Sequence, residues 1–282
     1  VDEGGFILST GKNIEKYNAY DTGIFHCSPS IFDAIEESIA KNEDSSLSGG
    51  IRILAVKGKV KAFGIKGKFW IDIDDDGVLK KAEKILMGTL KKASDGPISK
   101  YLNRPLSTRI SKQLVKTPIT PNIISFTSFI ISIIGALLFF LGGYLGLAVG
   151  GVLVQLSSIL DGCDGEIARL KYKGTEFGGW FDAVLDRYAD SIILFGLTYL
   201  VYLTSGNLGL FIGFIAIIGS FMNSYTADKY DGLMQKKMGV ERSYLRLGRD
   251  VRMFIIFVGA LINQPFLSIL LIAVLMNLEN VR

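Results

Sequence analysis

The chain has 282 residues, which is enough for one or two domains. Hydrophobic residues make up 49% of the sequence, the mean hydropathy is +0.37 and the formal net charge is +4, values that argue against an ordinary soluble globular protein. The two cysteines, Cys27 and Cys163, lie far apart and show no C-x-x-C spacing, so the sequence predicts neither a disulfide framework nor a zinc site.

The apolar residues are unevenly distributed along the chain. Residues 1–95 are mixed and polar, residues 96–118 are basic and amphipathic, and residues 119–282 are mostly apolar. This shift in composition predicts three segments: an N-terminal domain, an amphipathic helix at the membrane interface, and a membrane domain.

Residues 1–95 alternate short β-like runs with amphipathic helices. The runs at 23–27 and 59–63 are typical of strands, and the segments near 29–42 and 76–92 show helical periodicity. Alternation of this kind predicts an α/β layer structure.

Two short segments of this N-terminal domain carry a resemblance. The runs 21–25 and 69–74 resemble the second half of the sugar-phosphate nucleotidyltransferases, in which the residue matching Asp72 helps to bind a catalytic metal. That family's glycine-rich loop, which cradles the nucleotide phosphates, has no counterpart here, and Gly4-Gly5 does not replace it. The resemblance is to a partial domain, so we expect a scaffold or docking role in place of nucleotidyl transfer.

The segment from about residue 88 to residue 118 combines an apolar face with basic charge. Its apolar residues recur at every fourth position: Ile98, Leu102, Leu106, Ile110 and Leu114. Its basic residues are Lys91, Lys92, Lys100, Arg104, Arg109, Lys112 and Lys116. Such a helix before a membrane span is typical of one that lies along the lipid headgroups, and Pro105 is expected to kink or divide it. The apolar face disfavours nucleic-acid binding, the competing use of this charge.

Six apolar segments, taken with their charged ends, are long enough to cross a bilayer. They cover residues 121–141, 144–167, 178–204, 207–232, 244–262 and 265–280. Alternate connections carry no charge, and the others hold the Lys and Arg residues, so the positive-inside rule places both termini in the cytosol. The predicted fold is an α-helical polytopic protein of the cell membrane with six transmembrane helices and an N-terminal α/β cytosolic domain.

Spans three and five have apolar runs that are too short to cross a bilayer by themselves. Both helices must therefore continue through charged residues. This brings two charged sets to membrane depth: Asp182, Asp186 and Asp190 on span three, and Arg249 and Arg252 on span five. Because intramembrane charges face a polar cavity or one another, the sequence predicts a shared cavity open to the cytosol, with simple Arg–Asp structural pairs as the alternative.

Four carboxylates with helical spacing lie at the cytosolic ends of spans two and three. Asp161 and Asp164 are three residues apart, and Asp182 and Asp186 are four apart, so each pair shares one face of its helix. Like charges gathered at one point repel one another unless cations lie among them. Carboxylate oxygens are ligands that Mg²⁺ and Mn²⁺ prefer, so the spacing predicts a divalent-metal site on the cytosolic side.

These residues belong to a longer motif. The spacing D-x2-D-G-x2-A-R-x8-G-x3-D-x3-D is filled at every position, by Asp161, Asp164, Gly165, Ala168, Arg169, Gly178, Asp182 and Asp186. On this motif the chain resembles the CDP-alcohol phosphotransferase family, whose members transfer a substituted phosphate group from a CDP-alcohol to an acceptor hydroxyl and release CMP. The resemblance thus implies an enzyme.

The resemblance also implies roles for individual residues. The metal ligands would be Asp161, Asp164, Asp182 and Asp186, holding two Mg²⁺ or Mn²⁺ ions, with Asp186 also acting as the catalytic base. The CDP-alcohol donor would lie against Asp161, Gly165, Ala168, Arg169, Gly178 and, from the similar pattern at the start of span one, Asn122.

The basic residues near span five are expected to bind the acceptor. A guanidinium fork matches a phosphate, whereas an uncharged polyol does not need two of them. The sequence therefore predicts a phosphorylated acceptor held by Arg249 and Arg252, with Arg242, Arg246 and Lys229 as further candidates.

Several alternatives for the substrates stay open. The two domains together resemble the bifunctional inositol-phosphate cytidylyltransferase and di-myo-inositol phosphate phosphate synthase proteins, which implies a CDP-inositol donor, an inositol phosphate acceptor and a homodimer in the bilayer. A lipid donor of phospholipid synthesis, such as CDP-diacylglycerol or CDP-archaeol, is equally open. A cation transporter is the competing class of protein, although its acids would not all cluster at one membrane face. We expect no nucleic-acid partner.

Overall fold

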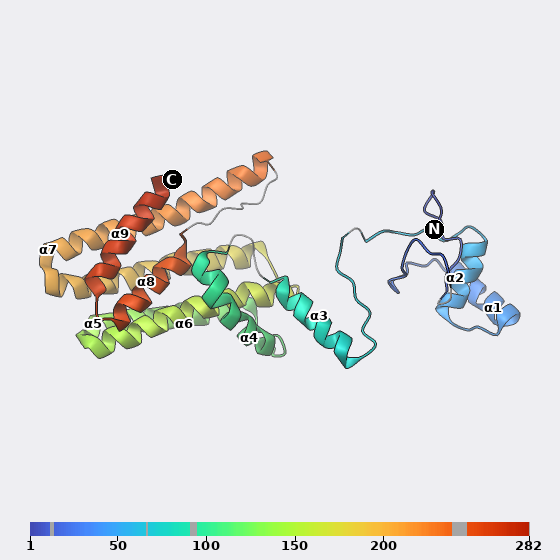
Figure 1. Ribbon diagram of the computed structural model, residues 1–282, viewed down its shortest axis with the longest axis horizontal. Coiled ribbons are helices and arrows are strands. Elements are labelled where there is room, and N and C mark those ends of the chain that lie inside the picture. Colours follow the sequence, from blue (N-terminus) through green and yellow to red (C-terminus); the bar gives the residue numbers. More distant parts are fainter. Residues whose placement is uncertain (12–13, 66, 91–94, 239–246, 282) are drawn as a thin grey trace. The chain divides into compact units, whose positions relative to one another are not determined.

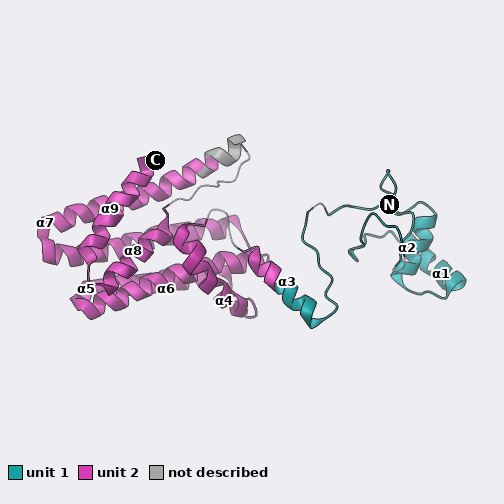
Figure 2. Cartoon of the chain, viewed as in Figure 1, with its two compact units in different colours: residues 1–83 teal, residues 84–282 magenta. Residues whose placement is uncertain are grey.

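The computed structural model (Figure 1) describes all residues except 12–13, 66, 91–94, 239–246 and 282. Among the described residues the secondary structure is helical and contains no strand. They divide into two compact units, Val1–Glu83 and Lys84–Arg282 (Figure 2).

The N-terminal unit contains two packed helices, α1 (Ser30–Asn42) and α2 (Leu47–Val56), and the first part of α3 (Asp76–Gly88). The first two helices approach closely because Gly50 carries no side chain. A Cβ atom at that position would lie 2.6 Å from Cγ1 of Ile35. The core of this unit is therefore a contact between two helices.

The α/β layer predicted for the N-terminal domain is not formed in the described residues. The run at 59–63 makes only an isolated antiparallel bridge, between Lys61 and Phe6, and the run at 23–27 contains no strand residue. A strand needs a hydrogen-bonded neighbour along its length, and a single bridge does not supply one. The helices predicted to begin near residues 29 and 76 are present, as α1 and α3.

The C-terminal unit contains a helix of two consecutive segments that packs on α6 (Gly143–Leu170). A five-residue π-helix (Ser99–Asn103) leads directly into α4 (Arg104–Leu114). Pro105 lies in the first turn of α4, where its missing N–H group is tolerated. The backbone stays helical across this junction, where the hydrogen-bonding pattern changes from π to α, so the helix is not broken at Pro105.

A cluster of buried charges attaches α4 to α6. Nη1 of Arg104 donates to the Glu166 carboxylate at 2.9 Å and to the Gly162 carbonyl at 3.2 Å, and Oγ of Ser107 donates to Glu166 at 2.7 Å. Nε and Nη2 of Arg104 donate to Asp95 at 2.9 and 2.8 Å. Burial alone would lower the pKa of Arg104, but the two carboxylates raise it overall, so the guanidinium stays charged.

The apolar face predicted for this segment is only partly buried. Ile110 and Leu114 pack against Ile124 and Ile167, whereas Leu102 is exposed. The packing of α4 on α6 therefore combines apolar contacts with polar ones. Polar atoms of α6 face α4, and polar side chains of α4 satisfy them.

Within the described residues, three helices are long and apolar enough to cross a membrane. They are α5 (Pro121–Leu141), α6, and α7 (Glu176–Met238) over its residues 176–230. Two shorter helices, α8 (Arg249–Leu261) and α9 (Pro265–Val281), pack with them. The C-terminal unit is thus a helical membrane domain.

The long helix α7 consists of two helices that meet at Gly206. This residue has a φ of 61° and a ψ of −144°, a backbone conformation open essentially to glycine alone. The chain reverses direction there (Figure 1). After the turn the two halves lie close together, because a Cβ atom on Gly213 would lie 2.2 Å from Cγ2 of Thr198. The reversal falls in the uncharged connection between the predicted third and fourth spans.

Glycines also allow α6 to approach both α5 and α8. A Cβ atom on Gly150 would lie 2.7 Å from the carbonyl oxygen of Gly135, and one on Gly151 would lie 2.4 Å from Cβ of Ala260. In lipid there is little hydrophobic drive to bring helices together, so close van der Waals packing of small residues is what joins them. This packing holds the end of α8 beside α6.

Replacing Gly151 by Ala tests the approach of α6 and α8. The added Cβ atom lacks room, so we expect a lower Tm, with an overpacking cost of about 1–3 kcal/mol. Gly179→Ala is the matched control, because nothing lies within 4 Å of a Cβ atom there and alanine favours the helix. Thermal unfolding in detergent measures both variants. Equal Tm values would contradict the prediction.

Replacing Arg104 by Met tests the charge cluster between α4 and α6. The change removes the guanidinium that pairs with the buried Glu166, and breaking a buried pair in this way typically costs about 3–5 kcal/mol. The double variant Arg104→Met with Glu166→Gln should recover part of the lost Tm. Arg109→Met on the exposed side of the same helix is the control. A loss no larger than that of the control would show that the cluster adds no stability.

Candidate metal centre

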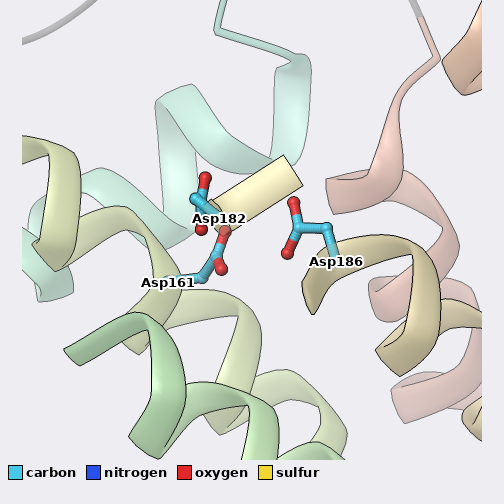
Figure 3. A group of neighbouring side chains, drawn as sticks. All are labelled: Asp161, Asp182 and Asp186. Carbon is cyan, nitrogen blue, oxygen red and sulfur yellow. The ribbon is translucent and has the colours of Figure 1, made fainter. Parts of the chain in front are cut away.

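Three carboxylates from two helices lie together in the C-terminal unit (Figure 3). Asp161 of α6 and Asp182 and Asp186 of α7 each offer one oxygen, and these oxygens lie within 4.8 Å of one another. The three side chains are half-buried, and Oδ1 of Asp182 is buried with no hydrogen-bond partner in the described part of the chain. A buried carboxylate oxygen without a donor is unfavourable, so the group is suited to receiving a cation.

Arg249, the first residue of α8, lies against this group of carboxylates. Its Nη1 is 3.0 Å from Oδ2 of Asp161 and 2.8 Å from Oδ1 of Asp186. Its Nε is 3.0 Å from Oδ1 of Asp190, one turn further along α7. A single guanidinium therefore contacts carboxylates from both helices that form the group.

Asp190 also holds the second arginine of α8. Nη2 of Arg252 donates to Oδ2 of Asp190 at 2.5 Å and lies 3.4 Å from Oγ of Ser224. The side chains of Arg252 and Asp190 are 1% and 2% exposed. Both arginines expected at membrane depth thus pair with Asp190, which is the Arg–Asp pairing that the sequence left open as an alternative.

The fourth motif carboxylate, Asp164, is not one of these three, although its side chain adjoins that of Asp182. It accepts hydrogen bonds from the hydroxyl of Ser125 on α5 and from the backbone N–H of Gly165. Three residues along a helix advance by roughly 300°, so Asp164 is rotated by roughly 60° from Asp161 around α6. The structure thus brings together three of the four predicted ligands and turns the fourth toward α5.

The residues predicted to bind a nucleotide lie around the same helix ends. A Cβ atom on Gly178 would lie 3.3 Å from Oδ1 of Asn122, so the start of α5 and the start of α7 are neighbours. A Cβ atom on Gly165 would lie 3.4 Å from Nη1 of Arg169. Nη2 of Arg169 donates to the carbonyl of Leu90 at 3.1 Å. Ala168 is half-buried on the same turn of α6.

The remaining candidates for acceptor binding are less informative. Lys229 is exposed on α7, and its Nζ lies 5.6 Å from the ring centroid of Tyr225. Arg242 and Arg246 lie outside the described residues. Arg249 is therefore the predicted acceptor ligand whose position relative to the carboxylates is best defined.

Sequence reasoning missed three polar residues that support the motif. Ser125 and Ser128 reach Asp164 and Asp161 from α5, the second at 3.5 Å, and Glu166 anchors α6 to α4. The available signal for Ser125 and Ser128 was their spacing, because two serines three residues apart on an otherwise apolar span share one face of the helix. Glu166 occupies an unassigned motif position, and its partner becomes visible only in the fold.

The donor set of this group fits a hard divalent cation. All the available ligand atoms are carboxylate oxygens, the atoms that Mg²⁺ and Mn²⁺ bind in proteins. The unpaired buried oxygen of Asp182 adds a ligand atom that no protein donor satisfies in the described residues. The residues present therefore fit a divalent metal.

The part of the chain that holds this group matches a known family. Residues 118–278 match the CDP-alcohol phosphatidyltransferase family. Over 281 residues the chain is 36% identical to the bifunctional IPC transferase and DIPP synthase of Aquifex aeolicus, covering 98% of this chain and 63% of that relative. It thus spans less than two thirds of the relative's length. Over 176 residues it is 30% identical to the archaetidylinositol phosphate synthase of Pyrococcus horikoshii, covering 62% of this chain and 86% of that relative.

A solved structure shares the fold. The crystal structure of Mycobacterium tuberculosis phosphatidylinositol phosphate synthase in complex with manganese and citrate has a TM-score of 0.52 and 25% identity, covering 62% of this chain and 85% of that one. The match to the family, over residues 118–278, extends over more than half of the chain and includes the complete motif. The chain belongs to the CDP-alcohol phosphatidyltransferase family, the CDP-alcohol phosphotransferases that its motif resembles.

Proposed function

We propose that this protein transfers a substituted phosphate group from a CDP-alcohol to the hydroxyl of an acceptor alcohol and releases CMP. One observation carries the proposal: a member of this family places Asp161, Asp182 and Asp186, from two helices, within 4.8 Å of one another. A site of oxygen ligands suits a reaction that is accelerated mainly by positioning and by neutralising phosphate charge.

The metal ligands in this proposal are the four motif carboxylates, Asp161, Asp164, Asp182 and Asp186, with two Mg²⁺ or Mn²⁺ ions. When bound, the metal stabilises negative charge on the phosphoryl oxygens and on the departing CMP. Asp164 joins the other three from the same helix as Asp161. The nucleotide lies along α6 and the start of α7, against Gly165, Ala168, Arg169, Gly178 and Asn122.

Asp186 is the proposed catalytic base. It takes the proton from the acceptor hydroxyl, whose oxygen then forms a bond to the β-phosphorus of the donor. The bond between that phosphorus and the bridging oxygen breaks, and CMP leaves with the electron pair. Oδ1 of Asp186 lies 2.8 Å from Nη1 of Arg249, the proposed acceptor ligand, which supports a base close to the acceptor.

The proposed donor is CDP-inositol and the proposed acceptor is an inositol phosphate. The similarity to a bifunctional IPC transferase and DIPP synthase, which covers 98% of this chain, favours these substrates. A lipid CDP-alcohol is the second candidate, favoured by the similarity to an archaetidylinositol phosphate synthase that is matched over 86% of its length. Membership of a transferase family favours both over the cation transporter.

The proposed organisation of the chain follows the sequence analysis. Residues 119–282 form the catalytic membrane domain with six spans, two of them from the halves of α7, and residues 96–118 lie at the cytosolic interface. Residues 1–95 act as a scaffold or docking domain. Both termini and the site face the cytosol, and the enzyme works as a homodimer.

A screen of donors against acceptors tests the proposal directly. CDP-inositol, CDP-diacylglycerol and CDP-archaeol are each incubated with inositol phosphate or free inositol, with Mg²⁺ or Mn²⁺, and CMP is measured. We expect metal-dependent CMP release that requires the phosphorylated acceptor. Absence of CMP from every pair would contradict the proposed reaction, whereas release from a lipid donor alone would replace the proposed substrate.

Single substitutions should distinguish the carboxylates that only bind metal from the one that also acts as the base. Asp161→Asn and Asp182→Asn should weaken binding of the CDP-alcohol together with turnover, because the pyrophosphate loses its neutralising partner. Asp186→Asn should lower kcat by about 10²–10⁴-fold, the usual contribution of a general base, while metal-dependent CDP binding largely survives. Calorimetry and CMP release measure the two properties. Equal losses of nucleotide affinity in all three variants would refute this division of roles.

Arg249 should contribute to acceptor binding, with Arg252 beside it and Arg242, Arg246 and Lys229 as further candidates. At saturating Mn²⁺, Arg249→Gln should raise the acceptor KM about tenfold or more, as for a lost charged hydrogen bond, and leave the donor KM nearly unchanged. Arg187→Gln is the control, because that arginine pairs with Asp228 instead. A change confined to the donor KM would assign Arg249 to the other substrate.

A further inference from the structure

The guanidinium of Arg249 lies against two of the carboxylates that would hold a metal. Its Nη1 contacts Asp161 at 3.0 Å and Asp186 at 2.8 Å, two of the three grouped carboxylates. The side chain of Arg249 is 13% exposed, so little water screens these contacts. A positive charge from the protein therefore lies at the proposed metal position.

We propose that Arg249 is an exchangeable counter-cation of this site. In the absence of metal it neutralises Asp161 and Asp186 and keeps α6, α7 and α8 together. When a divalent metal binds, Nη1 leaves both carboxylates, and the freed guanidinium edge turns to the acceptor phosphate. The inference rests on the proposed metal-dependent function.

Electrostatics makes the two states mutually exclusive. A metal that takes the facing oxygens of Asp161 and Asp186 removes the acceptor atoms of Nη1 and repels the guanidinium at short range. Both effects lower the affinity of the site for metal as long as the arginine is in place. The metal therefore has to displace Arg249, and the free energy of that displacement is part of the measured metal affinity.

Asp190 keeps the displaced arginine within reach. Its Oδ1 is 3.0 Å from Nε of Arg249, and its Oδ2 is held by the buried Arg252. The contact through Nε does not use the metal-facing oxygens, so it survives the exchange. Rotation about this attachment moves the Nη edge while the base of the side chain stays in place, which couples metal binding to acceptor binding.

The alternative is that Arg249 is a permanent structural brace. A brace would keep its contacts whether or not metal is bound, and its removal would destabilise both states alike. An exchangeable cation stabilises the metal-free state more than the metal-bound state, in which only its contact with Asp190 remains. The two roles therefore differ in metal affinity and in the dependence of Tm on metal, neither of which requires turnover.

Titration of purified protein with Mn²⁺ alone, followed by electron paramagnetic resonance, tests the exchange. Without the competing charge, Arg249→Gln should bind Mn²⁺ with a Kd about tenfold lower than that of the unaltered protein. Arg187→Gln removes the same charge from the residue after Asp186, away from the group, and should leave Kd unchanged. A Kd for Arg249→Gln that is unchanged or higher overturns the inference.

Arg249→Lys keeps the positive charge but loses the fork that spans three carboxylates. Its Mn²⁺ Kd should fall between those of Arg249→Gln and the unaltered protein. A lysine variant that binds Mn²⁺ as tightly as the glutamine variant would exclude charge competition. This variant keeps the proposal testable if Arg249→Gln does not fold.

Thermal unfolding with and without Mn²⁺ gives an independent readout. Arg249→Gln should have a lower Tm than the unaltered protein without metal, and the difference should become smaller at saturating Mn²⁺, where only the contact with Asp190 is lost. An equal Tm loss in both conditions would identify a brace and overturn the exchange. If the unaltered protein binds no Mn²⁺, the proposed metal-dependent function itself fails, and that result is distinct from a failure of the exchange.

Discussion

The charge balance where α6, α7 and α8 meet governs the architecture of the membrane domain. Asp161, Asp186 and Asp190 lie on helices that pack among apolar residues, and Arg249 contacts all three within 3.0 Å. Charges buried at membrane depth are tolerated only when they are paired or hydrogen-bonded. Arg249, the first residue of α8, must therefore lie at the same membrane depth as these three carboxylates.

Close helix packing makes this charge balance geometrically possible. Gly150 and Gly151 let α6 approach α5 and α8 at distances that any larger residue would prevent. The polar end of α6 is held from its other side by Arg104, through the buried Glu166 and the carbonyl of Gly162. The segment that carries Asp161 is thus fixed from two sides, by small-residue packing and by a charge cluster.

The charge arrangement also distinguishes the two arginines of α8. Arg252 is buried against Asp190 and Ser224, and it contacts none of the three grouped carboxylates. Arg249 is slightly exposed and faces the group directly. Two residues with the same chemistry and one helical turn between them thus have different surroundings, and of the two it is Arg249 that faces the grouped carboxylates.

The family match covers the membrane domain, whereas the similarity to the Aquifex aeolicus relative covers 98% of this chain. The family match covers residues 118–278, and the N-terminal unit contains a packed pair of helices, without strands in its described residues. The Aquifex aeolicus relative is longer, and the chain spans 63% of it. The membrane domain therefore carries the family's motif, while the contribution of the N-terminal unit has to be measured separately.

The sequence by itself determined the long helices, the reversal near Gly206 and the identity of the motif carboxylates. These features depend on local rules: apolar length, the conformational freedom of glycine, and the spacing of residues along one helix. Tertiary structure alone decided that Asp164 turns to Ser125, that Glu166 pairs with Arg104, and that α4 buries its polar side. It also decided that the predicted N-terminal strands do not assemble into a sheet. Partners from distant segments depend on how helices pack and rotate against one another, and residue spacing within one helix carries no information about that.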